Sequence, residues 1–150
     1  MKKIFLISLL LFFTSCGYQA VYKNIDNENL KISIRNIDGD NEVNNLIKNR
    51  LQRYISKNIK DSIILDISTE YSKLVLSKDL TGKAADLQLT AKSSFTITYK
   101  NIEEKFIIEE SLNIENSSNA YEQNNYENVI RNNFASSISQ KLILKLISIK

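Results

Sequence analysis

The chain has 150 residues, of which 43% are hydrophobic and 25% charged, a composition typical of one globular domain. It contains no histidine, one cysteine and three glycines. Within this chain these counts exclude a Ser-His triad, an imidazole metal site, an internal disulfide and a glycine-rich phosphate loop. The formal net charge is only +3 at pH 7, which gives no indication of nucleic-acid binding.

The N-terminal residues have the order of an export signal. Lys2 and Lys3 precede the apolar run 4–13, which has the length of a signal-peptide core and is too short to span a bilayer. Thr14 and Ser15 then place small residues directly before the single cysteine, an arrangement that resembles the bacterial lipobox. The alternative is a buried N-terminal helix that happens to contain the cysteine.

A lipobox predicts cleavage before Cys16 and attachment of diacylglycerol to its thiol. We therefore predict a lipoprotein signal peptide over residues 1–15, a lipidated tether over 16–29 and a single domain over 30–150. Stable anchoring takes two or more membrane signals, which acylation of the new amine supplies. Apart from this covalent lipid anchor we predict no cofactor and no metal. Because an Asp after the cysteine commonly retains bacterial lipoproteins at the inner membrane, Gly17 favours the outer membrane.

The domain begins with a strand and a helix. Leu30, Ile32 and Ile34 alternate with polar residues, which predicts a short strand with one buried face. A turn at residues 38–40 follows, and we expect the helix to be capped by Asp40 or Asn41. Apolar residues then recur at helical spacing, at Val43, Leu46, Ile47, Leu51, Tyr54, Ile55 and Ile59.

Three strands are predicted next. In the first, apolar residues change parity after Tyr71, which indicates a bulge near Ser72-Lys73. The second has the most regular alternation, with Ala85, Leu87, Leu89, Ala91, Phe95, Ile97 and Tyr99 on one face. The third has Phe106, Ile108, Leu112 and Ile114 on one face. Glu110 shares that apolar face, so we expect it to lie near an edge or to meet a basic partner.

A second long helix completes the chain. Asn119, followed three residues later by Glu122, resembles a capping box. The apolar stripe comprises Tyr126, Val129, Ile130, Phe134, Ile138, Leu142 and Leu146, although residues 142–149 could also form a strand. The order β-α-β-β-β-α predicts an α+β fold, with two helices packed on one face of a mostly antiparallel four-stranded sheet.

The chain offers little for catalysis. Glu103-Glu104 and Glu109-Glu110 are neighbours on a strand and point to opposite faces, so neither pair can share a substrate, and we predict no enzyme. Lys73, Lys78 and Lys83 surround the turn at residues 81–82, and their ammonium groups could bind phosphate. The alternative is solubilising charge on a hairpin.

These motifs together resemble the LPS-assembly lipoprotein LptE family. The segment 16–22, Cys-Gly-Tyr-Gln-Ala-Val-Tyr, is similar to the start of the mature family members. The segment 82–89, Gly-Lys-Ala-Ala-Asp-Leu-Gln-Leu, is similar to the turn into the family's long strand. The region from Asn116 through the last helix fits as well. The resemblance covers nearly all of the chain after the signal peptide.

The resemblance implies a function in lipopolysaccharide transport and outer-membrane assembly. Such lipoproteins are anchored in the inner leaflet of the outer membrane and face the periplasm. They plug the lumen of the LptD β-barrel, assist its assembly and can bind lipopolysaccharide. By position, Lys78 and Lys83 are the residues to which the resemblance assigns lipopolysaccharide binding. The alternative is a lipoprotein subunit of another envelope lipid transporter, with an ABC or MCE-type partner.

Overall fold

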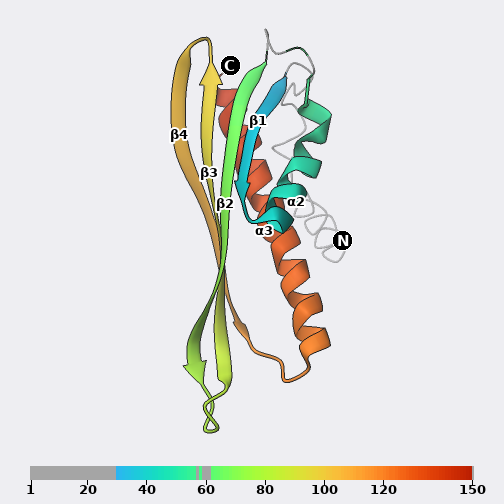
Figure 1. Cartoon of the computed structure of the whole chain (residues 1–150), viewed down its shortest axis with the longest axis vertical. Helices are drawn as coiled ribbons and strands as arrows, with labels where there is room; N and C mark the ends of the chain where they lie inside the picture. Colours follow the sequence, from blue (N-terminus) through green and yellow to red (C-terminus); the bar gives the residue numbers. More distant parts are fainter. Residues whose placement is uncertain (1–29, 57, 59–61, 150) are drawn as a thin grey trace, which may run out of the picture.

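The computed structural model describes residues 30–56, 58 and 62–149. These residues form four strands, two α-helices and one short 3₁₀ turn. In chain order the elements are β1 Ile32–Gly39, α2 Asn41–Leu51, η3 Gln52–Tyr54, β2 Ile63–Lys78, β3 Ala84–Tyr99, β4 Ile102–Glu115 and α3 Ala120–Ile149 (Figure 1). The predicted order β-α-β-β-β-α is confirmed. No helix in the described part of the chain is long and apolar enough to cross a membrane.

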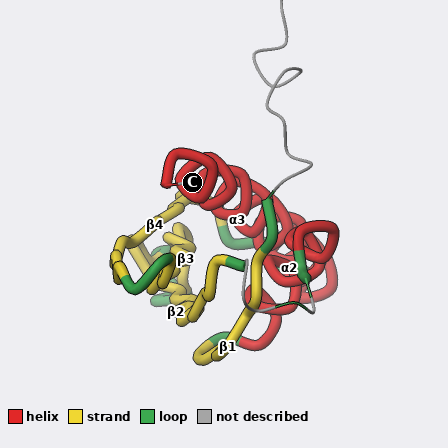
Figure 2. Tube along the Cα trace, turned by 90° about the horizontal axis from the view of Figure 1, so that it is seen from above, coloured by secondary structure: helices red, strands yellow, loops and turns green. Residues whose placement is uncertain are grey.

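The strands form one sheet in the order β1-β2-β3-β4. β1 runs parallel to β2, whereas β2 and β3, and β3 and β4, are antiparallel. A parallel pair needs a crossover connection, which α2 and η3 provide. Both helices cover the same face of the sheet, and the other face is open (Figure 2). The predicted fold class is confirmed.

The core lies between the sheet and the helices. Every second residue of β3 from Leu87 to Ile97 is buried, because side chains of a strand alternate between its two faces. The rings of Phe95 and Phe106 stack with centroids 5.3 Å apart. The largest fully buried side chains are Phe95, Ile32, Ile47, Leu51, Ile63, Leu65, Ile67, Leu87, Leu89, Ile97, Ile138 and Leu142. Each stabilises the fold by about 1.5–3 kcal/mol relative to exposure.

A close backbone contact joins the turn between β1 and α2 to strand β2. Gly39 has φ +89°, and a Cβ there would lie 2.1 Å from the carbonyl oxygen of Thr69 on β2. This approach lets the Asp40 N–H donate to the same oxygen at 2.7 Å. The Asp40 carboxylate then accepts from the Val43 N–H at 2.8 Å, so Asp40 is the helix cap.

The first helix is shorter than its apolar stripe predicts. α2 ends at Leu51 and η3 ends at Tyr54, after which Ile55 has extended backbone and bridges Ile32. The Ser56 N–H donates to the Ile32 carbonyl at 2.9 Å. Because Ile55 pairs with the start of β1, the chain does not continue into another helical turn. Ile59, the last residue of the predicted stripe, lies outside the described residues.

The second helix runs to Ile149, so the tail is helical and not a strand. Its cap is Asn119, whose Oδ1 accepts from the Tyr121 N–H at 3.0 Å. The Asn119 N–H donates to Ser117 Oγ, and no bond to it from Glu122 is found among the described residues. The helix therefore forms the forward half of the predicted capping box.

The start of α3 departs from the predicted stripe. Tyr126 and Val129 are 50% and 55% exposed, whereas Gln123 and Glu127 are buried in their place. The physical reason is the opposing strand: β2 presents Lys73 to this part of the helix, and Glu127 pairs with it. The stripe from Ile130 to Leu146 is buried as predicted.

The predicted bulge near Ser72-Lys73 is wrong. Both residues pair with β3 in unbroken register, and the register shifts only between Val75 and Lys78. Leu74 is 58% exposed on the open face of the sheet. Leu74 and Leu76 lie on the open face, and Val75 lies where β2 has become an outer strand, because β1 pairs with β2 only as far as Thr69.

Candidate functional site

The candidate site is the end of the β2–β3 hairpin. Lys78 is the last residue of β2, and Lys83 directly precedes β3. The Asp79 N–H donates to the Lys83 carbonyl at 2.8 Å, and the Gly82 N–H donates to the Asp79 carbonyl at 3.0 Å. Both predicted lysines therefore flank one closed turn at the lower end of Figure 1.

The turn is organised by one carboxylate. Asp79 Oδ1 accepts from the Thr81 N–H at 2.8 Å, the Thr81 hydroxyl at 2.7 Å and the Lys83 N–H at 3.0 Å. The hydrogen bond from the Thr81 side chain is the main cause of a lowered pKa of Asp79. Asp79 is thus an Asx-type turn residue, and its charge is directed toward the loop's own donors.

The side chains of the two lysines are exposed at the tip of the hairpin. The ion pairs among the described residues include neither Lys78 nor Lys83. An ammonium group without an internal partner can turn toward an external anion at low cost. Gly82, at φ +83°, has open space around it, so nothing in the described chain covers the turn.

Exposed apolar side chains adjoin these lysines, a feature that the sequence analysis missed. Leu80 at the tip is fully exposed, and Leu74, Val75 and Leu76 on β2 are 58%, 44% and 46% exposed. The signal is present in the run Leu-Val-Leu of residues 74–76, because both strand parities are apolar there. Leu74 and Leu76 share the open face of the sheet, whereas Val75 points to the other face. The two leucines, together with Leu80, are candidates for a binding surface.

A groove lies beside this cluster. It has a volume of about 340 Å³ and is lined by Leu76, Asp86, Asn113, Ile114 and Glu115. Asp86 and Glu115 are neighbours on β3 and β4, and Ser77 Oγ donates to Asp86 at 2.5 Å. The hairpin end thus presents cations at its tip, apolar side chains behind them and carboxylates at its base.

Lys73 does not belong to the site. Its side chain points to α3 and pairs with Glu127, which also accepts from Gln123 Nε2 at 2.7 Å. Burial opposes ionisation of Glu127, but the bonds from Lys73 and Gln123 outweigh it and keep its pKa below the ordinary value. Strand parity could have shown this, since Lys73 shares the helix-facing parity of Tyr71.

Glu110 meets a basic partner, as expected. Its Oε1 accepts from Lys141 at 2.6 Å and from the Ser137 hydroxyl at 2.7 Å. Burial opposes ionisation here too, and the two bonds outweigh it, so the pKa of Glu110 is lowered. Its neighbour Glu109 lies on the open face, as alternation requires. Glu109 and Glu110 therefore lie on opposite faces of the sheet. The prediction that the chain is not an enzyme depends on this arrangement.

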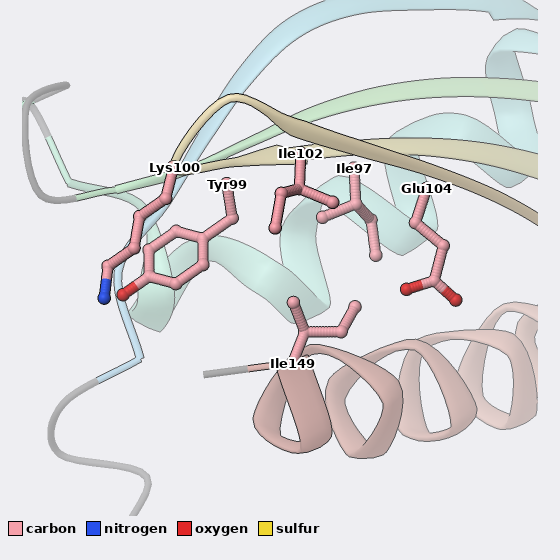
Figure 3. Close-up of a pocket in the computed structure, with 6 residues that line it drawn as sticks. All are labelled: Ile97, Tyr99, Lys100, Ile102, Glu104 and Ile149. Atoms are coloured by element: carbon pink, nitrogen blue, oxygen red, sulfur yellow. The ribbon is translucent and has the colours of Figure 1, made fainter.

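A second recess lies at the other end of the sheet, beside the β3–β4 turn. It has a volume of about 200 Å³. Lys100 and Glu104 are its charged residues, and its other lining residues are Ile97, Tyr99, Ile102 and Ile149 (Figure 3). The length of β3, about 50 Å at 3.3 Å per residue, separates it from the lysine turn. The lipidation residue Cys16 lies outside the described residues.

Comparison with known proteins identifies the fold. No protein-family model and no curated protein matches the sequence. Among solved structures, rare lipoprotein B from Shewanella oneidensis matches with a TM-score of 0.60 at 18% identity, covering 79% of this chain and 98% of that one. A lipoprotein from Caulobacter crescentus matches with a TM-score of 0.55 at 13% identity, over 78% and 88%.

A third match is lipoprotein B from Nitrosomonas europaea, with a TM-score of 0.52 at 12% identity over 76% of this chain and 81% of that one. At these identities the likeness shows a shared fold. The architecture is that of these small lipoproteins, and it is consistent with the LptE-family fold that the sequence resemblance implied.

Proposed function

We propose that this chain is an outer-membrane lipoprotein of the lipopolysaccharide assembly machinery, anchored through acylated Cys16 in the inner leaflet. In this proposal it plugs an LptD-type β-barrel and helps to assemble it. The observation that carries the proposal is the fold, which covers 98% of rare lipoprotein B and follows a lipobox-like segment in this sequence. Both features point to a small lipoprotein of the envelope.

The open face of the sheet supports residence in a barrel. The interior of a membrane β-barrel is polar, so a plug needs polar side chains that can pair with it. On this face Lys92 of β3 lies between Glu70 of β2 and Glu109 of β4. Gln88 and Asn113 share a hydrogen bond of 3.2 Å there. The face is therefore rich in donors and acceptors.

The hairpin end supports binding of lipopolysaccharide. The lipid portion of lipopolysaccharide combines phosphorylated glucosamines with acyl chains. A binding site for it therefore needs cations next to apolar surface. Lys78 and Lys83 supply the cations, and the exposed side chains of residues 74–76 and Leu80 supply the apolar surface. Lysines that served only solubility would not need exposed leucines beside them.

The test is the double variant K78E/K83E. We expect the purified chain to bind lipopolysaccharide about tenfold more weakly at low salt, and the loss to shrink at high salt because exposed charges are screened. The folded state should be unaffected, since both side chains are exposed. Binding is measured by titration at two salt concentrations, with a melting curve for each variant.

The matched control is K31E/K48E, which makes the same change in net charge on the exposed part of the chain away from the hairpin. It should bind lipopolysaccharide as the wild type does. Equal loss in both double variants would mean that only net charge matters. Unchanged binding in K78E/K83E would assign these lysines to solubility.

A further inference from the structure

The described chain begins at the end of the sheet opposite the lysine hairpin. Ile32 of β1 pairs with the first residue of β2, and the second residue of β2 pairs with Thr98 of β3. Tyr99 of β3 pairs with Ile102 of β4 across the β3–β4 turn. The start of β1 and the β3–β4 turn therefore lie together at the upper end of Figure 1. The predicted tether over residues 16–29 joins the domain at this end.

Exposed cations lie at this end beside aromatic rings. Lys100 lies in the β3–β4 turn, with its Nζ 5.1 Å from the ring centre of Tyr99 (Figure 3). Arg53 lies two residues before Ile55, which bridges the start of β1, and its Cζ is 4.7 Å from the ring centre of Tyr54. The ion pairs among the described residues include neither cation. Both charges can therefore meet an external anion.

The carboxylates of β4 at this end are neutralised within the chain. Glu103 pairs with Lys105 at 3.3 Å, and Glu104 pairs with Lys145 of α3. The charge that these ion pairs leave over is that of the two cations beside the tyrosines. This end of the domain therefore favours a negatively charged partner.

Apolar surface adjoins Lys100. Ile102 is 72% exposed, and together with Tyr99 and Ile149 it lines the recess of about 200 Å³. Figure 3 shows Tyr99 and Ile102 directed toward Ile149 at the C-terminal end of α3. Tyrosine, lysine and exposed aliphatic side chains are the residue types that lie at a bilayer surface, with the apolar groups among the headgroups and the cations at the phosphates.

We propose that this end of the domain binds the surface of an anionic phospholipid bilayer. Arg53 and Lys100 lie at the lipid phosphates, and Ile102 lies among the headgroups. The inference rests on the proposed anchoring through acylated Cys16, and it adds a contact that the folded domain itself makes with the membrane.

Two observations select a bilayer as the partner. The first is the tether, which begins at the predicted anchor Cys16 and ends at this end of the domain. At 3.3–3.6 Å per residue, residues 16–29 span at most about 50 Å, so the anchor holds this end close to the membrane. The second is charge, since cations without an internal partner attract anionic lipids.

The contact is compatible with one copy of the chain inside a barrel. β3 is about 50 Å long at 3.3 Å per residue, whereas the apolar band of a membrane β-barrel is about 25 Å tall. A chain in the lumen therefore projects from the band at one end. The tether places the end with Lys100 beside the inner leaflet, and the lysine hairpin then lies in the lumen.

Quenching by brominated lipids tests the proposal. The full-length chain is reconstituted in vesicles of phosphatidylcholine and phosphatidylglycerol with bromine on the acyl chains. A thiol-linked fluorophore is attached to I102C, and we expect the lipids to quench it. V129C, whose parent side chain is 55% exposed on α3, is the matched control and should be quenched little. The wild-type chain gives the background from Cys16.

Charge reversal tests the role of the cations. R53E/K100E, in the I102C chain, should lower the ratio of quenched to unquenched label about tenfold, and vesicles of brominated phosphatidylcholine alone should give a similarly low ratio. K78E/K83E makes the same change in net charge at the other end of the sheet and should leave the ratio unchanged.

The inference is overturned if I102C is quenched no more than V129C, or if R53E/K100E leaves the quenching unchanged. Mass spectrometry of Cys16 tests the proposed anchor independently. An acylated chain whose I102C label is not quenched would overturn the membrane contact alone. Quenching of I102C that R53E/K100E abolishes, in a chain with an unmodified Cys16, would support the contact and overturn the anchor.

Discussion

Gly39 and Gly82 both have positive φ, but their surroundings differ. A Cβ at Gly39 would lie 2.1 Å from the Thr69 carbonyl oxygen, whereas a Cβ at Gly82 has no atom within 4 Å. We expect G82A to destabilise the chain by about 1–2 kcal/mol, the cost of left-handed backbone in an L-residue. G39A should cost about 2–5 kcal/mol, because strain and a backbone clash add.

Urea denaturation of the two alanine variants measures this difference. G82A serves as the matched control, since it changes the same residue type at nearly the same φ. Equal destabilisation would show that the contact between the β1–α2 turn and β2 does not constrain the fold.

Glu127 makes stability dependent on pH. Its carboxylate is buried and held by Lys73 and Gln123, and its pKa is lowered in the folded chain. A lowered pKa means that its contribution is complete above the unfolded value of about 4.3 and is lost as the pH falls through the folded value. E127Q should therefore cost about 1–2 kcal/mol at pH 7, and the difference from wild type should shrink below about pH 4.

The measurement is urea denaturation of wild type and E127Q at pH 7, 5, 4 and 3. E122Q, an exposed change in the first turn of the same helix, is the control. A cost of E127Q that stays constant from pH 7 to pH 3 would contradict an ionised carboxylate at this position.

The role of a strand residue can be predicted where the alternation of side chains shows which face of the sheet it lies on. Glu110 lies on the apolar parity of its strand, which predicts either a position near an edge or a basic partner. β4 is an outer strand of the sheet, and Lys141 is the basic partner. The same argument shows that Lys73 faces α3. Its closeness in sequence to Lys78 suggests, wrongly, that it belongs to the hairpin tip. The partner Glu127 could not be predicted, because nothing local indicates where α3 crosses β2.

The end of the β2–β3 hairpin offers two kinds of contact to a lipid, one through charged side chains and one through apolar side chains. Leu76 and Leu80 are exposed beside the lysines. We expect L76S/L80S to weaken lipopolysaccharide binding about equally at low and high salt, because apolar burial is not screened as charge is. K78E/K83E should differ from it by its salt dependence.

The control for the leucines is V129S/L144S, which removes two exposed apolar side chains from α3. Titration with lipopolysaccharide at two salt concentrations distinguishes the variants. If L76S/L80S binds like the control, the acyl chains do not contact this hairpin.

Element boundaries follow the sequence where a cap or turn fixes them. Asp40 and Asn119 cap their helices because each carboxylate or amide reaches the first N–H groups of the helix. The end of α2 was not predictable in this way. Ile55 fits both a helical stripe and a bridge to β1, and only the tertiary pairing with Ile32 decides between them.

At the scale of the whole molecule, periodicity alone predicts the α+β class. β3 alternates over its whole length because one face meets the helices and the other is open. Strand order could not be predicted, since β1 joins the sheet through the crossover and could have paired with either edge. The sequence singled out Lys78 and Lys83, which the structure places on one turn, whereas the apolar run of residues 74–76 did not by itself show which of its side chains would be exposed.

The partnership that we propose for this chain is with an outer-membrane barrel in lipopolysaccharide assembly. Affinity purification of the full-length chain from detergent-solubilised membranes tests it most directly, with bound proteins identified by mass spectrometry. We expect an LptD-type β-barrel to co-purify with the chain. Co-purification of an ABC or MCE-type inner-membrane transporter, with no barrel, would contradict it.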